Sequence, residues 1–345
     1  KQKTAYEIGV RLVGSEMCIR DSSRGLCAIS AYQLALCAAR VHALVSAKTQ
    51  ENIMERELFR ALQAALRRLG RRRGSRRFRY TDATIVEVYY WAVLNDRSVL
   101  WACQIVNWPP GLRRGALPSQ PDVSRRLRTR SVQRLIARLE QLVLRTGRSI
   151  PLVCAIDGKP LPIAGHSTDP QAGYGRAARG KAKGYKLHVL VDLMGTVWGW
   201  RVTPMNGDER TIARRLVASL PGEGYLLADA NYNSSRIFGA AAARGVQLVS
   251  PRRQRGGRMG LGHHPQHPAR LRCIDMLENG VSDFGTGLHQ LRRSVERFLG
   301  TLSSTGGGLT CLPGWVRRHR RVRLWVQAKL IFNQLRADRR RALAA

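Results

Sequence analysis

The sequence predicts an α/β fold, a mixed sheet with flanking helices, preceded by an all-α, helix-turn-helix-like region. Two observations lead to this prediction. Between residues 149 and 250, short apolar runs rich in Val, Leu and Ile alternate with amphipathic stretches of helical period. Between residues 80 and 148, apolar residues recur at helical spacing, and the run 107–111, NWPPG, is typical of a helix end.

The all-α region begins with residues 50–69, which have helical propensity and apolar spacing. An arginine-rich linker follows at 71–79. The next helical stretch, 81–108, opens on Thr81 and Asp82 as candidate N-caps.

Residues 117–143 predict two short amphipathic helices. Arg125, Arg126 and Arg128 lie on and after the first of them and point away from its apolar face, so they are candidate DNA-binding residues. A helical bundle with a solvated basic face explains the same pattern equally well.

The α/β part has the order β-β-β-α-β-α-β, then a basic insertion, then a helix. A turn at Met194–Gly195–Thr196 separates the second and third strands. The strands are expected at 150–158, 184–195, 197–204, 224–230 and 246–251, and the helices at 206–220, 234–245 and 288–302.

The pattern divides the chain into segments. Residues 1–22 read as a translated sequencing adapter, which places the native start near Met54 and excludes these residues from the fold. The apolar run after them is interrupted by Gln33, Arg40 and His42, so we interpret it as a helix or as out-of-gene translation and not as a membrane span. The other expected segments are a helical segment with a basic linker (23–79), a helical DNA-binding region (80–148), a catalytic domain (149–250 and 284–336), a basic insertion loop (251–283) and a basic tail (337–345).

The charge favours a polyanionic partner. The chain has 59 basic and 23 acidic residues and a formal net charge of +36. DNA or RNA would relieve the self-repulsion, although a GC-rich gene would also enrich arginine.

The seven cysteines of the chain include no CxxC pair, which indicates reduced thiols in the cytoplasm. His263, His264, His267 and Cys273 match no standard zinc spacing, so a basic loop is the better interpretation.

Three acids stand where chemistry is expected. Asp157 ends the first strand, Asp229 ends the fourth, and Glu296 lies on the last helix. If the first strand is central and the fourth lies beside it, both aspartates meet at one sheet edge. Carboxylates converging in this way suit two Mg²⁺ or Mn²⁺ ions for phosphodiester chemistry.

Each acid also has an ordinary structural explanation. Asp229 could cap a helix, Asp157 could belong to a turn, and Glu296 could pair on the helix surface with a residue four positions earlier.

Two residues on the second strand are further candidates for DNA binding. Alternation places Lys186 and His188 on one face of that strand. His188 fits a core position as well as it fits a DNA contact.

The motifs together resemble the DDE transposases of bacterial insertion sequences, of the IS4 and IS5 groups, whose catalytic domain is ribonuclease H-like. The resemblance covers about residues 117–336 and is clearest over 155–330. AIDGKPL resembles the first-aspartate motif, LADANYNS the second, and RRSVERFLGTL the third. Where that family has Tyr and Lys in the third motif, this chain has His289 and Ser303.

The resemblance implies a two-metal mechanism with Asp157, Asp229 and Glu296 as metal ligands and Arg292 near the DNA strand. The implied activity is an endonuclease step at the element's ends, followed by joining of the 3′-hydroxyl to target DNA in transposition. It also implies a homodimer or higher multimer on DNA, in the bacterial cytoplasm and associated with the nucleoid. Two other interpretations stay open: a degenerate or domesticated DNA-binding protein, and a ribonuclease H-like nuclease without strand transfer.

Overall fold

The chain divides into two compact units, Lys1–Ile53 and Met54–Ala345. The computed structural model describes residues 53–70, 78–112, 115–145, 148–163, 168–178, 180–220, 222–252, 265–279, 283–304 and 308–344. The predictions for residues 1–22 and for the apolar run after them therefore lie outside the described residues.

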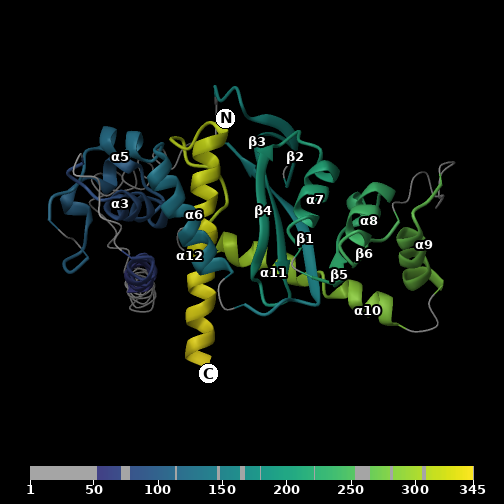
Figure 1. Cartoon of the computed structure of the whole chain (residues 1–345). Helices are drawn as coiled ribbons and strands as arrows, with labels where there is room; N and C mark the ends of the chain where they lie inside the picture. The colour runs from purple at the N-terminus through teal and green to yellow at the C-terminus, as the bar shows by residue number, and fades with distance from the viewer. Residues whose placement is uncertain are drawn as a thin grey trace, which may run out of the picture. The chain divides into compact units, whose positions relative to one another are not determined.

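A six-stranded mixed sheet forms the centre of the second unit (Figure 1). The first strand, β1, pairs antiparallel with β3 and parallel with β5. β6 continues the sheet beyond β5, and β4 pairs with β3 on the other side. The strands are β1 (Val153–Pro162), β2 (Gly173–Ala177), β3 (Gly180–Asp192), β4 (Val197–Pro204), β5 (Gly224–Leu227) and β6 (Val246–Val249).

The predicted α/β fold class is confirmed, and the first strand is central as expected. The turn between β3 and β4 also lies where it was predicted. Asp192 accepts hydrogen bonds there from the backbone N–H groups of Met194 and Thr196, and Gly195 has a φ of 78°, which favours glycine. The sequence did not predict β2, which forms a hairpin with the first residues of β3.

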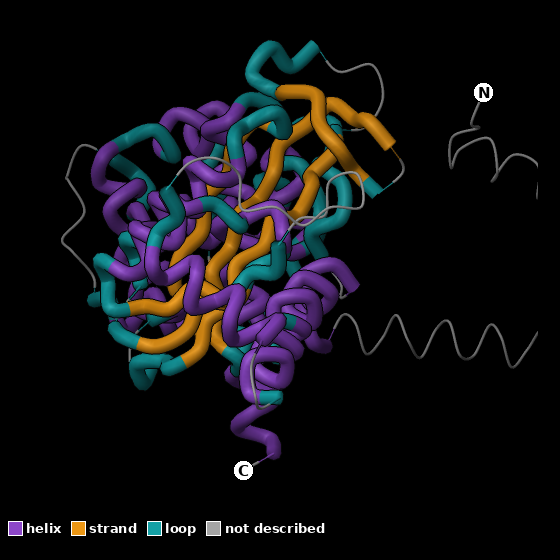
Figure 2. Tube along the Cα trace, turned by 90° about the vertical axis from the view of Figure 1, so that its right-hand side faces the viewer, coloured by secondary structure: helices purple, strands orange, loops and turns teal. Residues whose placement is uncertain are grey.

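Five of the described helices pack on the sheet, and the one that belongs to the 251–283 segment is described below. α7 (Glu209–Val217) packs on β3 and β4, α8 (Ser235–Ala242) packs on β6, and α11 (Arg293–Ser304) packs on β1 and β3. Figure 2 shows the strands enclosed by helices in a second view.

The fourth helix, α12 (His319–Ala344), packs against β4 on one side and against helices of the all-α region on the other. In Figure 1 it stands between them. Residues 324–334 are buried without a break, as expected of a helix with neighbours all round.

A buried aspartate fixes the start of α12. Asp169 is 3% exposed and accepts hydrogen bonds from the Tyr185 hydroxyl (2.8 Å), the Arg318 N–H (2.7 Å) and the Gln171 N–H (3.0 Å). Burial raises the pKa of this carboxyl, but these hydrogen bonds outweigh burial and hold the pKa below its usual value. Asp169 thereby joins its own loop, β3 and α12.

The all-α region contains a helical stretch over 53–68 and a series of shorter helices. Thr81 is the N-cap of α3, as predicted, because its hydroxyl accepts from the Thr84 N–H. The expected single helix over 81–108 is wrong beyond residue 94, where Asp96 adopts a φ of 49° and stops the α-helical ladder. The helices are α3 (Asp82–Leu94), α4 (Val99–Ala102), η2 (Ile105–Asn107), α5 (Gln120–Arg126) and α6 (Arg130–Leu144).

The segment expected to be an insertion loop, 251–283, contains a helix. α9 (Pro268–Ile274) starts with His267 as its cap and buries Ala269 and Cys273, which are four residues apart on one face. A π-helical turn (Asp275–Asn279) follows, and α10 (Phe284–Gln290) leads to α11. Residues 253–264, with His263 and His264, lie outside the described residues. None of the described helices is both long enough and apolar enough to cross a membrane.

Candidate active site

Asp157 lies in β1, with a side chain that is 25% exposed. Its Oδ1 accepts a hydrogen bond from the Gly158 N–H (2.7 Å). Its Oδ2 lies 3.7 Å from Nη1 of Arg292. The prediction that Asp157 ends the first strand is wrong. β1 continues to Pro162 because its pairing with β3 extends past Asp157, which pairs with Val189 and therefore stands within the sheet and not at its rim.

Asp229 lies two residues after the end of β5. β5 pairs in parallel with residues 153–155 of β1. Its carboxylate accepts from the backbone and side-chain nitrogens of Asn231, both at 3.0 Å, and so caps a 3-10 turn (Ala230–Tyr232). Its carbonyl accepts from the Ser250 hydroxyl (2.7 Å) at the end of β6. The capping explanation is therefore correct. Because Ala155 of β1 pairs with Leu227 of β5, Asp229 follows β5 at the level of Asp157 on the neighbouring strand.

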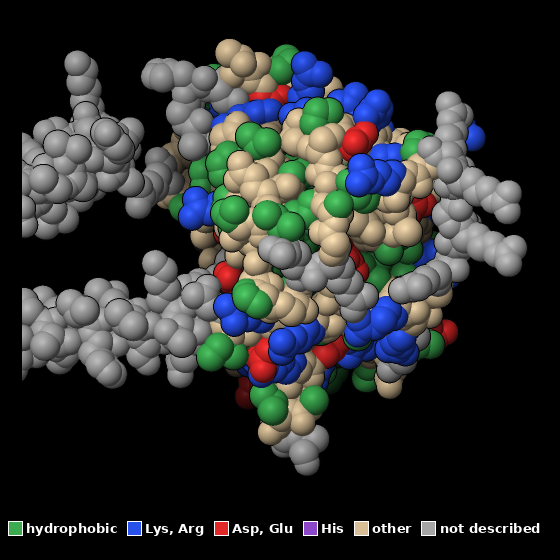
Figure 3. All heavy atoms as spheres, turned by 90° about the vertical axis from the view of Figure 1, so that its left-hand side faces the viewer, with side chains coloured by type: hydrophobic (Ala, Val, Ile, Leu, Met, Phe, Trp, Pro, Cys, Tyr) green, Lys and Arg blue, Asp and Glu red, His purple; other side chains and the backbone are tan. Residues whose placement is uncertain are grey.

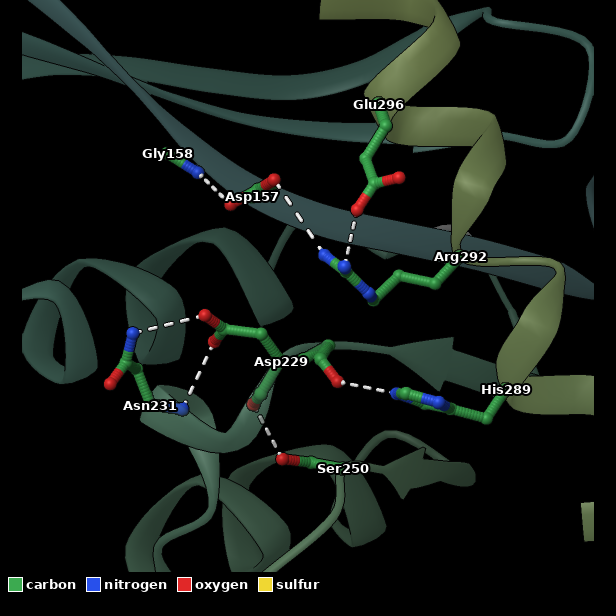
Figure 4. A network of polar contacts seen from close by, with 9 residues as sticks. Asp157, Gly158, Asp229, Asn231, Ser250, His289, Arg292 and Glu296 are labelled. Carbon is green, nitrogen blue, oxygen red and sulfur yellow. Dashed lines mark hydrogen bonds and ion pairs between the residues drawn. The ribbon is translucent and has the colours of Figure 1, made fainter. Parts of the chain in front are cut away.

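Glu296 lies in the first turn of α11 and is joined to Asp157 through Arg292 (Figure 4). The Arg292 guanidinium forms an ion pair with Glu296, four residues later, and also reaches Asp157. The Glu296 side chain is 50% exposed, and that of Arg292 is 22% exposed.

The electrostatics show that the three acids influence one another. Burial raises the pKa of Asp157 to about 6. The Gly158 N–H and Arg292 lower it, while the negative charges of Asp229 and Glu296 raise it further. We call Asp157, Asp229 and Glu296 the acid cluster.

The acid cluster fits a divalent cation in charge and ligand type. Carboxylate oxygens are the ligands that Mg²⁺ and Mn²⁺ prefer. The pKa of Asp157 is raised mainly by burial and to a lesser extent by the negative charges of Asp229 and Glu296, and a bound cation would offset those charges. Among the described residues, however, no three Asp, Glu, His or Cys side chains lie close enough together to hold a metal ion. Arg292 lies between two of the three acids instead. Asp157 and Asp229 are thus the pair best placed to hold an ion, with Glu296 engaged by arginine.

Two neighbours of the acid cluster were not predicted. Tyr232 is buried at 1% exposure, and burial together with the charges of Glu209, Asp157 and Asp229 raises its pKa well above the ordinary value. Glu209, at the start of α7, is therefore a fourth carboxylate near the site. The only sequence signal for it was its place in NGDE, between a strand and a helix.

The positions where the resembling family has Tyr and Lys are built differently here. A ring nitrogen of His289 shares a hydrogen bond with the carbonyl of Ala228 (3.1 Å), which ties α10 to the residue before Asp229. Lys159 of β1 donates from Nζ to the Ser303 hydroxyl (2.6 Å). The amino group of Lys159 therefore lies at Ser303, the α11 position where the resembling family has a lysine.

Lys186 and His188 lie on one face of β3, as predicted, but neither is open to solvent. The Lys186 side chain is 13% exposed and forms an ion pair with Glu209. His188 is 1% exposed, and its Nε2 shares a hydrogen bond with the Thr203 hydroxyl (3.0 Å). Its Nδ1 has no hydrogen-bond partner among the described residues. This burial favours the core alternative for His188 over a DNA contact.

The buried imidazole predicts a loss of stability in acid. Burial lowers the pKa of His188 to about 4, against about 6.5 in an unfolded chain. Between these values the unfolded state binds more protons, so the free energy of unfolding falls as pH drops from 6.5 towards 4. We expect His188 to account for about 3 kcal/mol of that fall.

The measurement is urea unfolding of wild type and His188→Gln at several pH values from 7 to 4. The glutamine does not titrate, so the wild-type advantage over the variant should shrink with decreasing pH. A pH-independent difference between the two proteins would contradict the prediction.

The three predicted arginines of the helical region have different surroundings. Arg125 has a 74% exposed side chain and pairs with Asp122 on its own helix. Arg128 is also exposed. Arg126 is 7% exposed, pairs with Asp82 (2.5 Å), donates to the Tyr80 carbonyl (3.1 Å) and stacks 4.0 Å from the centre of the Phe78 ring. A DNA contact by Arg126 does not fit this burial, because its guanidinium already holds α3 to α5.

In Figure 3, apolar and uncharged side chains separate the basic groups on one face of the molecule.

This difference predicts two distinct phenotypes. Arg126→Gln should lower the free energy of unfolding by about 2–3 kcal/mol, because Asp82 and the Tyr80 carbonyl lose their partner. The double variant Arg125→Gln/Arg128→Gln should change stability by less than about 0.5 kcal/mol, since both side chains are exposed. It should weaken duplex DNA binding if these arginines contact phosphates.

Urea unfolding and fluorescence anisotropy with labelled duplex DNA measure the two effects. Weaker DNA binding by folded Arg126→Gln, with unchanged stability, would reverse the assignment.

A family model described as a transposase DDE domain matches residues 148–326, slightly more than half of the chain. The matched range contains every strand of the sheet and all three members of the acid cluster. No curated protein matches this sequence.

Proposed function

The chain belongs to the transposase DDE domain family, and on that premise we propose that it cuts DNA at the ends of an insertion sequence and joins the freed 3′-hydroxyl to target DNA. The observation that supports this most is the acid cluster. Asp157 and Asp229 lie on neighbouring parallel segments of the sheet, and Arg292 connects Asp157 to Glu296. The active form is a homodimer or larger multimer on paired element ends.

Asp157 and Asp229 would hold the divalent ions that the reaction needs, and Glu296 would join them once Arg292 releases it. Bound Mg²⁺ or Mn²⁺ would stabilise the charge on the attacking and leaving oxygens of the phosphodiester. Asp157, with a pKa of about 6, is mostly ionised at neutral pH and is therefore available as a ligand. The hydrogen bonds from Asn231 hold the Asp229 carboxylate in place, which limits its loss of side-chain entropy on binding an ion.

Arg292 positions the phosphate. Its guanidinium has five N–H donors in a planar fork that matches a phosphate as well as a carboxylate. When DNA enters, a phosphate oxygen replaces one of its two carboxylate partners, and that carboxylate is released to the site. Lys159, whose pKa is lowered by burial, lies two residues from Asp157 on the same face of β1 and supplies a second cation for the DNA strand.

The test is a reaction of purified protein with a supercoiled plasmid that carries the gene and its flanking DNA, in Mg²⁺ or Mn²⁺. Nicking at two defined ends, followed by insertion into a second plasmid, supports the proposal. Binding without nicking would indicate the degenerate DNA-binding protein. Nicking without joined products would indicate a nuclease without strand transfer.

A further inference from the structure

β2 and the first five residues of β3 form a hairpin with two unlike faces. The cross-strand pairs Tyr174–Lys183 and Arg176–Lys181 alternate with pairs made only of glycine and alanine. Because side chains alternate across a strand, one face of the hairpin carries a tyrosine and three cations, and the other carries small residues. We call the two segments, 173–177 and 180–184, the basic hairpin.

The small face packs closely on the rest of the fold. A Cβ at Gly173 would lie 2.0 Å from the side-chain oxygen of Asn206, and one at Gly175 would lie 2.6 Å from the carbonyl of Met205. A Cβ at Gly184 would lie 2.3 Å from the carbonyl of Leu161. These distances leave no room for any side chain, so packing fixes which face of the basic hairpin points outwards.

The outward face has the composition of a nucleic-acid contact. Tyr174 is 59% exposed, and the amino groups of Lys181 and Lys183 each lie 5.9 Å from its ring centre. Arg176 and Lys181 are exposed and form no ion pair with any residue in the part of the chain that the structure describes. An exposed aromatic ring between cations suits a surface of phosphates and sugars.

The basic face lies on the same side of the sheet as the acid cluster. Asp157 pairs with Val189, and Lys183 and Lys181 are six and eight residues earlier on the same strand. Even spacing keeps all of them on one face of β3. At about 3.4 Å per residue, Lys183 lies about 20 Å along the strand from the level of Asp157. Six base pairs of duplex DNA, at about 3.4 Å each, have about the same length.

We propose that the basic hairpin is a second DNA-binding site, which grips the phosphates of duplex DNA about six base pairs from the bond cut at the acid cluster. Arg176, Lys181 and Lys183 contact phosphates, and Tyr174 packs against a sugar. This inference rests on the proposed function, because it assumes that the chain binds DNA. If the proposal is correct, the basic hairpin, and not the acid cluster, fixes the direction in which the duplex leaves the site.

The test measures binding of a labelled 30-base-pair duplex of random sequence by fluorescence anisotropy, in EDTA so that no cleavage occurs, at salt concentrations from 50 to 200 mM. The double variant Arg176→Gln/Lys181→Gln should reduce the slope of log affinity against log salt by about 1.8, since each lost phosphate contact removes about 0.9. Over this fourfold rise in salt, the wild-type affinity should fall about twelvefold more than that of the variant.

A matched control separates local contacts from total charge. Arg214 and Arg215 are exposed in the last turn of α7, outside the basic hairpin, and Arg214→Gln/Arg215→Gln removes the same charge. Its salt slope should stay at the wild-type value. Tyr174→Ala should weaken binding at every salt concentration without changing the slope, because tyrosine is uncharged, and Tyr174→Phe should bind like wild type. Urea unfolding confirms that each variant is folded.

The outcomes distinguish this proposal from the proposed function. If wild type binds the duplex and the hairpin variant keeps the wild-type slope, the hairpin assignment is wrong and the transposase proposal stands. An equal loss of slope in the hairpin and α7 variants would show a general charge effect and would also overturn it. A wild-type chain that does not bind the duplex overturns both proposals.

Discussion

Asp229→Asn is expected to reduce DNA nicking by about a thousandfold or more while DNA binding persists. Asparagine keeps the oxygen that accepts from the Asn231 N–H, so the capped turn after β5 is retained. The variant loses the negative charge with which Asp229 would hold a divalent ion, and losing stabilisation of charge in the transition state costs at least this much. The measurement is the rate of supercoiled plasmid nicking in Mg²⁺, with DNA binding measured in parallel.

The control for this prediction is Asp275→Asn. Asp275 is an exposed aspartate in the π-helical turn, so the same chemical change there should leave nicking unaltered. Asp229→Asn should also bind DNA as well as wild type or slightly better, since one charge that repels phosphate is gone. Nicking by Asp229→Asn at the wild-type rate would remove this residue from the acid cluster's chemistry and leave it as a turn cap.

Asp169→Ala is expected to destabilise the fold by about 3–5 kcal/mol. The alanine would leave the Tyr185 hydroxyl buried without its partner, along with the N–H groups of Arg318 and Gln171. A buried donor without an acceptor costs its full desolvation free energy, which applies to the Tyr185 hydroxyl, and the loss of the two part-buried N–H bonds adds to this cost. Urea unfolding at pH 7 measures the effect. An unchanged dependence of the free energy of unfolding on urea concentration shows that the two-state comparison with wild type is valid.

An exposed aspartate provides the comparison. Asp208 caps α7 by accepting from the N–H groups of Arg210 and Thr211, and Asp208→Ala should cost only about 1 kcal/mol. Asp169→Asn, which keeps one acceptor oxygen, should lie between the two alanine variants. Equal costs for the two alanine variants would mean that Asp169 does not hold α12 to β3.

Five of the six described strands could be predicted because each has a local apolar signal. The apolar runs before Asp157 and Asp229 appear in the structure as β1 and β5, paired side by side, although β1 continues past Asp157 to Pro162. The hairpin strand β2 could not be predicted in this way. Three of its five residues are glycine or alanine, and their pairing with β3 depends on packing against Met205 and Asn206, which are distant in sequence.

Among the DNA-binding candidates, the sequence pattern identified basic residues but not their surroundings. Arg125 and Arg126 are adjacent on one short helix, and only the path of α3 decides that Arg126 is buried against Asp82 while Arg125 faces solvent. For His188, the sequence fitted a core position and a DNA contact equally well. Its burial and its hydrogen bond with the Thr203 hydroxyl of the neighbouring strand favour the core position. A periodic pattern gives the face of an element but not what covers that face.

By itself, the sequence determined the element order and the three acids with the arginine that precedes Glu296, because these depend on local apolar period and on motifs along the chain. The central position of the first strand, assumed in the sequence analysis, is given by its pairing with β3 and β5. Only the tertiary structure decided that Arg292 lies between Asp157 and Glu296, that Lys159 reaches Ser303, and that the basic hairpin shares a face with the acid cluster. The physical reason is distance along the chain. A carboxylate and a guanidinium 135 residues apart interact only after long-range strand pairing has brought them within a few ångströms, and no local pattern encodes that pairing.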